Sequence, residues 1–301
     1  MSDLGSIIAE PLRHAFMQHA FSAILLVGII CGVIGSFVIL RGLAFMGDAL
    51  AHAIFPGVVI AYLLGGNFLF GALVAAVIVS LGIGALGQSG RLTNDTAIGV
   101  FFAGAFALGI ALISAQRTYT RDVTSFLFGS ILGVSRDDLL LTGFVGAVVL
   151  AVMYLFRREF VTVAFDRSFA AASGLHLWAW DQLFLVMLSL AIVVSIQTVG
   201  NVLVLAMLVT PAATARLLTD RLSTMVVIAA LVGAVSGVAG LSVSYYGGIA
   251  SGASVVLTAT ALFALTYLFA PRSGIVTVRV ARRWHYAASH PEREAEMPHG
   301  V

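Results

Sequence analysis

The sequence contains no lysine, and its basic and acidic residues nearly balance. All 16 basic residues are arginine, and with 14 acidic residues they give a formal net charge of +2. This small excess gives no indication of nucleic-acid binding, which needs a concentrated basic surface, so no nucleic-acid partner is expected. Charged residues make up only 10% of the chain, against about 25% in a typical soluble domain.

Cysteine and the common catalytic motifs are scarce as well. The single cysteine, Cys31, excludes a disulfide framework or a cysteine-based zinc site within one chain. There is no Gly-x-x-x-x-Gly-Lys-Ser/Thr phosphate loop for ATP and no His-Glu-x-x-His motif of a zinc protease. We therefore expect a protein that is not itself an enzyme and holds no permanently bound cofactor.

What the sequence has in abundance is apolar residues, at 60% of the chain. Residues 49–90, 182–215 and 222–271 contain no Asp, Glu, Lys or Arg, and about 20 apolar residues suffice for a helix to cross a bilayer. The alternating short segments of a membrane β-barrel are absent. The composition predicts an all-α, polytopic membrane protein surrounded by lipid.

Eight or nine membrane-spanning helices are predicted. The count depends on residues 182–217, where Gly200 and Asn201 mark either a turn between two spans or a kink within one broken helix. The spans are expected near 19–40, 44–64, 67–87, 96–115, 138–156, 182–199, 200–217, 223–244 and 251–269.

The arginines predict the orientation, because cytoplasmic loops of membrane proteins are enriched in basic residues. Placing Arg157 and Arg158 in the cytoplasm puts 12 of the 16 arginines on that side. An odd number of spans then places the N-terminus outside.

Two segments between spans are too structured for plain loops. Residues 117–138 have an apolar centre too short to span and predict an external lateral or re-entrant helix. Residues 157–181 are expected in the cytoplasm, with an Ala-rich helix ended by Gly174 as its C-cap. From the residues alone, 157–181 is equally well a docking surface for a cytoplasmic partner or an ordinary connector. Residues 1–270 form the transmembrane domain, and 271–301 a polar cytoplasmic tail.

Asp48 and His52 are the candidate site residues. They lie four residues apart within an apolar segment, so on a helix they share one face. A carboxylate oxygen and an imidazole nitrogen suit manganese, iron or zinc, and two chains meeting on a two-fold axis would supply four ligands. The alternatives are a buried hydrogen-bonded pair without further function and a proton relay through Asp48. Because burying a carboxylate in a membrane is costly, we favour a functional role.

Two prolines lie within predicted spans. Pro56, one turn beyond His52, and Pro211 each lack a backbone donor and are expected to loosen their helices, as a gate requires. Glycines at four-residue spacing, as in Gly28/Gly32 and Gly233/Gly237, permit close helix packing within or between chains. The other histidines are weaker candidates, and those of the tail, His285, His290 and His299, are interpreted as surface residues.

Three stretches resemble the metal-type permeases of ABC importers, a family that serves manganese, zinc and iron. They are RGLAFMGDALAHAIFPG at 41–57, FLFGSILGVSRDDL at 126–139 and QTVGNVLVLAMLVTPAATARLL at 197–218. The resemblance extends to about residue 270. It implies a fold similar to the vitamin B12 and siderophore permeases, a dimeric assembly, and a metal path lined by Asp48 and His52.

The resemblance also implies partners. These are a cytoplasmic ATPase, an extracytoplasmic metal-binding protein and a second permease chain, most simply an identical one, in a bacterial cytoplasmic membrane. The ATPase-coupling helix of such permeases has a Glu-Ala-Ala-x-x-x-Gly-like pattern. The segment from Asp166 is expected to take this role, with Ser168, Ala170 and Gly174 in the pattern, although the first two positions of the pattern differ.

The resemblance favours manganese as the transported ion, with zinc or iron as alternatives. The competing hypothesis is a proton-coupled secondary metal transporter in which Asp48 carries the proton.

Overall fold

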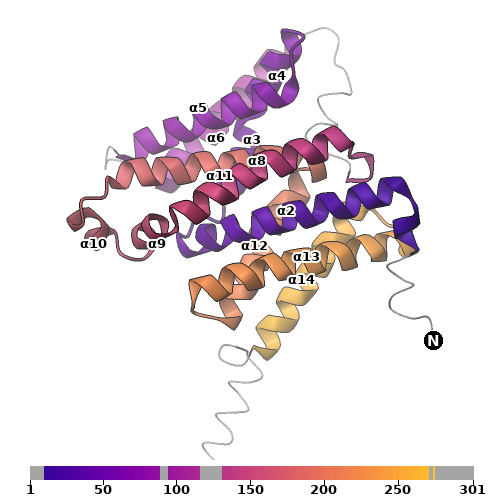
Figure 1. Cartoon of the computed structure of the whole chain (residues 1–301). Helices are drawn as coiled ribbons and strands as arrows, with labels where there is room; N and C mark the ends of the chain where they lie inside the picture. The colour runs from indigo at the N-terminus through magenta and orange to yellow at the C-terminus, as the bar shows by residue number, and fades with distance from the viewer. Residues whose placement is uncertain (1–9, 89–93, 116–130, 271–273, 275–301) are drawn as a thin grey trace, which may run out of the picture.

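A computed structural model describes residues 10–88, 94–115, 131–270 and 274, and all its regular elements are helices (Figure 1). Most of the expected lateral segment 117–138 lies outside the described residues, as does the tail 271–301 except Gly274. The described end of the lateral segment is the short 3₁₀ helix η2, Ile131–Gly133, which precedes α8.

Nine helical stretches of the described residues are long and apolar enough to cross a membrane. One of them, Met46–Leu63, consists of two short helices, α3 (Met46–Ala53) and α4 (Phe55–Leu63). The other eight are α2 (Ala15–Leu40), α5 (Phe68–Gln88), α6 (Asn94–Ser114), α8 (Arg136–Leu155), α11 (Leu177–Val199), α12 (Asn201–Leu218), α13 (Leu222–Gly247) and α14 (Ser251–Phe269). The all-α, polytopic prediction is confirmed.

The helices form two packed groups on either side of α11 (Figure 1). On one side, α4 packs against α5 and α6, and α5 packs against α11. On the other, α2 packs against α12 and α13, with α14 outside them. Helix α11 is the most enclosed of the nine spans, with 78% of its apolar stretch buried, whereas for α14 the value is 17%. An apolar helix exposed in this way is suited to lipid, because its backbone polar groups are satisfied internally.

Glycines set the closest helix crossings. A Cβ at Gly28 of α2 would lie 3.1 Å from the backbone of Gly233 in α13, and one at Gly32 would lie 2.8 Å from the Ala230 Cα. The close packing expected at these glycines therefore occurs within one chain. A Cβ at Gly35 of α2 would overlap the backbone carbonyl oxygen of Leu208 in α12, so this crossing tolerates no side chain.

Two interruptions position the candidate site. Residues 182–217 form two helices rather than one, because Gly200 has a φ of 89°, a conformation that other residues rarely adopt, and separates α11 from α12. The span Met46–Leu63 is interrupted at Ile54, so Pro56 falls in the first turn of α4, where a missing N–H costs little. Pro211, by contrast, lies inside the continuous helix α12.

Candidate metal site and coupling segment

Helix α3 carries Asp48 and His52 and begins after a sharp turn. Gly42, with a φ of 69°, ends α2: its N–H donates to Ile39, and the Leu43 N–H donates to the Val38 carbonyl. The chain then re-enters the protein as α3 at Met46.

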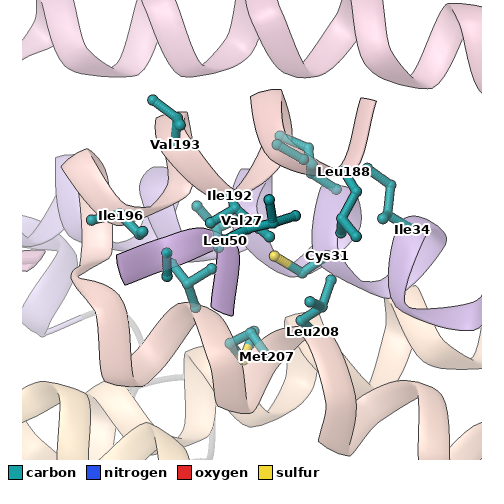
Figure 2. Close-up of a cluster of buried hydrophobic side chains, with 14 of the residues drawn as sticks. Val27, Cys31, Ile34, Leu50, Leu188, Ile192, Val193, Ile196, Met207 and Leu208 are labelled. Atoms are coloured by element: carbon teal, nitrogen blue, oxygen red, sulfur yellow. The ribbon is translucent and has the colours of Figure 1, made fainter. Parts of the chain in front are cut away.

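One face of α3 is fixed in the core. Leu50 is fully buried, and Figure 2 shows it among Val27 and Cys31 of α2, Ile192 of α11 and Met207 of α12. This packing fixes the rotation of the helix, because Leu50 and these four residues belong to the same apolar core. The opposite face of α3 is consequently the one that presents Asp48 and His52.

Asp48 and His52 lie close together on that open face. The His52 Nε2 is 3.5 Å from the Asp48 Oδ1. In the single chain the Asp48 side chain is 45% exposed and that of His52 is 31% exposed. The structure therefore brings the two predicted ligands together and leaves their outer side uncovered.

Two phenylalanines and one asparagine surround His52. Its ring centroid lies 5.7 Å from that of Phe102 and 5.5 Å from that of Phe106, both in α6. Within the described residues its Nδ1 is buried without a hydrogen-bond partner. The Nε2 lies 3.3 Å from the Nδ2 of Asn201, the first residue of α12.

Asn201 is the site residue that the sequence did not predict. The only sequence signal at this position was the Gly200-Asn201 break, which was interpreted as a turn or kink. Asn201 and His52 are separated by 149 positions in the sequence.

The other described histidines do not join this site. The described residues contain no group of three or more His, Cys, Asp or Glu arranged to hold a metal. His14 contacts Phe16 and Tyr245, and His176 is the N-cap residue of α11. An apolar cavity of about 800 Å³ between α4, α5 and α6 includes Pro56 in its lining but no ionisable side chain.

The expected coupling segment 157–181 forms two short helices at one end of the bundle, α9 (Arg157–Phe165) and α10 (Arg167–Ala172), followed by the start of α11 (Figure 1). The Asp166 carboxylate accepts a hydrogen bond from the Phe169 N–H at 2.8 Å and so caps α10. Gly174, with a φ of 81°, follows the helix, and the Leu175 N–H donates to the Ala170 carbonyl at 3.1 Å. These contacts define α10 at both ends.

Helix α10 has a buried and an exposed side. Ala170 is fully buried, whereas Ser168 and Phe169 are exposed. The exposed apolar side chains of this region come from α9, α10 and the start of α11: Phe165 (58% exposed), Phe169 (61%) and Trp178 (44%).

An ion-pair cluster ties the coupling segment to the turn before α3. Asp181 of α11 contacts the Arg41 Nη1 at 3.1 Å and the Arg167 Nη2 at 2.7 Å. The Arg41 Cζ also lies 4.4 Å from the centre of the Phe184 ring. A cavity of about 540 Å³ lies at this cluster, lined by its three charged residues, by residues of α5, α9 and α11, and by Leu43 and Met46 just before and at the start of α3.

Burial lowers the pKa of Arg41, and the Asp181 carboxylate opposes that shift. The guanidinium stays protonated, since its ordinary pKa lies far above neutral pH. Asp181 therefore neutralises a permanent charge that is largely removed from water.

Comparison with known proteins places the chain in a family. Residues 13–270 match the ABC 3 transport family. The chain belongs to this family. It is thus a multi-pass membrane permease of the ABC transporter class, as the sequence motifs indicated.

Relatives within the family are described as metal transport proteins. The chain is 48% identical over 277 residues to the manganese transport system membrane protein MntC of Halalkalibacterium halodurans, covering 92% of this chain and 95% of that protein. It is 36% identical over 271 residues to a probable iron transport system membrane protein of Haemophilus influenzae, covering 90% of this chain and 96% of that protein.

Solved structures share the fold. The structure of PsaBC from Streptococcus pneumoniae in complex with Fab contains a chain that is 35% identical, with a TM-score of 0.79, covering 92% of this chain and 99% of that one. An inward-facing structure described as a metal-chelate type ABC transporter is 16% identical, with a TM-score of 0.64 over 83% of this chain and 84% of that chain. The second similarity concerns the fold alone and agrees with the expected likeness to siderophore-type permeases.

Proposed function

We propose that this chain is the membrane-spanning subunit of an ATP-driven importer that carries Mn²⁺ across a bacterial cytoplasmic membrane. The observation that carries the proposal is the pair of Asp48 and His52, 3.5 Å apart on the open face of α3. A carboxylate oxygen and a neutral imidazole nitrogen form part of a site for a borderline divalent cation. The ion is the cargo, so it is bound only in passing.

A second copy of the chain completes the proposed site. The Asp48 side chain is 45% exposed in the single chain, and inside a membrane this face would otherwise meet lipid. Exposing a carboxylate to hydrocarbon costs at least about 2.5 kcal/mol, so the face needs a cover. In a homodimer with a two-fold axis beside α3, two carboxylates and two imidazoles would face each other.

The coupling segment is the proposed docking surface for an ATPase. Phe165, Phe169 and Trp178 are exposed at the end of the bundle formed by α9, α10 and the start of α11. A soluble partner would bury them. Asp166 and Gly174 define the two ends of α10 and Ala170 holds its buried side, while the exposed apolar side chains would provide the contact area. On the opposite side of the membrane, an extracytoplasmic metal-binding protein would deliver the ion.

The relatives support manganese over the alternatives without excluding iron. Of the two relatives quoted above, the one at 48% identity is named for manganese transport and the one at 36% identity for iron transport. Ligand type alone does not decide, because Zn²⁺ binds most nitrogen–oxygen sites more tightly than Mn²⁺ does. We place Mn²⁺ first, with Fe²⁺ and Zn²⁺ as competitors.

The helix interruptions around the site are the proposed moving parts. The break at Ile54, next to Pro56, would allow the angle between α3 and α4 to change. Pro211 has no N–H, so one backbone carbonyl of α12 lacks its helical hydrogen bond. A motion of this kind would open the site alternately to the two sides of the membrane.

Uptake of radioactive Mn²⁺ tests the proposal in cells that lack their own importers and express this chain with and without its ATPase. The decisive variant is Asp48→Asn, which keeps the shape but removes the charge. The matched control is Asp137→Asn, an exposed carboxylate in the first turn of α8. We expect ATPase-dependent uptake that falls to background in Asp48→Asn and is unchanged in Asp137→Asn.

Three results would contradict the proposal in different ways. Normal uptake by Asp48→Asn removes the assigned site. Uptake of Zn²⁺ but not Mn²⁺ changes the ion and keeps the class. Uptake that follows a pH gradient without the ATPase replaces the proposal with proton-coupled transport through Asp48.

A further inference from the structure

The side-chain amide of Asn201 contacts the Nε2 atom of His52, the nitrogen that would bind a metal ion. Gly200 turns the chain so that α12 begins beside α3, and the Asn201 Nδ2 lies 3.3 Å from the His52 Nε2. Within the described residues, the Asn201 side chain has no other hydrogen-bond partner. The amide therefore contacts the histidine of the proposed metal site and does not cap its own helix.

Nε2 is the nitrogen of His52 that faces the other polar groups. The Nδ1 is buried, without a hydrogen-bond partner among the described residues, and the ring packs against Phe102 and Phe106. An amide N–H can donate only to the lone pair of an unprotonated Nε2, and that same lone pair is the one that binds a metal. The hydrogen bond from Asn201 and a bond from His52 to a metal are thus mutually exclusive.

An ion at Nε2 forces a change in Asn201. The amide NH₂ group carries positive partial charge and would be repelled by a divalent cation. Rotation of the amide by about 180° exchanges the nitrogen for the carbonyl oxygen, which is a ligand favoured by hard cations.

The two distances from Nε2 are close to the separations between ligands of one ion. Metal–ligand bonds of about 2.1–2.3 Å at right angles place neighbouring donor atoms about 3.0–3.3 Å apart. The observed separations from the His52 Nε2 are 3.5 Å to the Asp48 Oδ1 and 3.3 Å to the Asn201 amide. Small side-chain movements would bring all three onto the ion.

We propose that Asn201 is a third ligand of the transported ion and biases the site toward Mn²⁺ over Zn²⁺. The inference rests on the proposed function, since it assumes that Asp48 and His52 bind the cargo. Each chain then supplies two oxygen ligands and one nitrogen ligand, instead of one oxygen and one nitrogen. Additional oxygen ligands favour ions that accept higher coordination numbers, and a neutral amide adds a ligand without adding charge that would retain the ion.

The test compares two substitutions of similar size, Asn201→Leu and Asn201→Asp. Leucine offers neither a donor nor an acceptor. Aspartate offers a metal ligand but cannot donate a hydrogen bond to Nε2. Binding of Mn²⁺ and Zn²⁺ is measured by titration calorimetry on the purified permease–ATPase complex, with Val202→Ala, an exposed neighbour in α12, as the control and thermal unfolding as a check on folding.

For Asn201→Leu we expect about a tenfold loss of Mn²⁺ affinity and a smaller loss for Zn²⁺, in keeping with the effect of deleting groups around a metal site. Asn201→Asp should bind Mn²⁺ at least as tightly as the wild type and transport it more slowly, because the ion leaves less readily. Val202→Ala should match the wild type.

Equal losses in both variants, with an unchanged preference between the two metals, would mean that Asn201 only positions His52 by its N–H. Wild-type affinities in both variants would also overturn the proposal. Failure of the proposed function itself looks different, since the wild type would then show no ATPase-dependent uptake or Asp48→Asn would retain it. If Asn201→Leu does not fold, the outcome for Asn201→Asp still decides between a ligand and a positioning donor.

Discussion

Replacing Asp181 with alanine removes the carboxylate that pairs with both Arg41 and Arg167. The burial of the two arginines predicts that losing the pair with Arg41 costs more stability than losing the pair with Arg167. The Arg41 side chain is 9% exposed, whereas that of Arg167 is 58% exposed. Removing one partner of a buried ion pair costs about 3–5 kcal/mol, while an exposed pair contributes about 0–1 kcal/mol. Because Asp181 is itself 28% exposed and Arg41 keeps its contact with the Phe184 ring, we expect a loss of about 2–4 kcal/mol.

Two further variants separate the buried pair from the exposed one. Arg167→Ala should cost at most about 1 kcal/mol. Combining Asp181→Ala with Arg41→Leu should recover most of the loss, because the buried charge disappears along with its partner. With the single Arg41→Leu variant completing the double-mutant cycle, the coupling free energy measures the Arg41–Asp181 interaction.

Chemical unfolding in detergent, followed by tryptophan fluorescence, is the assay. Trp178 lines the cavity beside the cluster and Trp180 contacts Phe160, so the emission reports on this region. Equal destabilisation by Asp181→Ala and Arg167→Ala would refute the reasoning, since it would mean that burial of Arg41 does not decide the cost. A double variant less stable than Asp181→Ala would refute it as well.

Three other predictions concern packing, docking and gating. Gly35→Ala should destabilise the protein by about 1–3 kcal/mol because its Cβ meets the Leu208 carbonyl, whereas Gly99→Ala, with nothing within 4 Å, should be neutral or stabilising; equal effects in thermal unfolding would contradict the close crossing of α2 and α12. Phe169→Ser should lower co-purification of the ATPase several-fold, while Phe144→Ser, an exposed position on α8, should leave it unchanged; unaltered co-purification would rule out docking through α10. Pro211→Ala should leave α12 intact and slow Mn²⁺ uptake, and normal uptake with raised stability would assign that proline no part in a gate.

The membrane spans were predictable from the sequence because span length and apolar composition are local properties. Eight of the nine predicted spans each correspond to one helix that begins and ends within about five residues of the expected limits, whereas 44–64 corresponds to the pair α3 and α4. The break in 182–217 proved to be a separation of two helices at Gly200. The four-residue spacing of the glycines predicted close helix packing. It did not indicate whether that packing occurs within one chain or between chains. The contact of Gly28 with Gly233 depends on the tertiary arrangement of α2 and α13.

Only the part of the candidate site that lies on one helix was predictable from the sequence. Asp48 and His52 are one turn apart, so helical geometry alone puts them on a common face. Asn201 approaches His52 across 149 positions and Asp181 approaches Arg41 across 140, and no periodic pattern in a single sequence connects such pairs. An asparagine at a helix start is usually explained by the helix itself, which is why its partner became visible only in the fold.

The environment of His52 also bears on how an ion can leave. In tightly bound metal sites, the second imidazole nitrogen usually donates to a carboxylate or carbonyl, and losing that partner costs about 10–100-fold in affinity or activity. Here, within the described residues, Nδ1 has no such partner and the ring packs against Phe102 and Phe106. Leu50 meanwhile holds the other face of α3 in the core. If Asp48 and His52 bind the ion as proposed, they would be held firmly in place and yet bind it weakly. Transport requires this combination, because an ion held too strongly would block its own path.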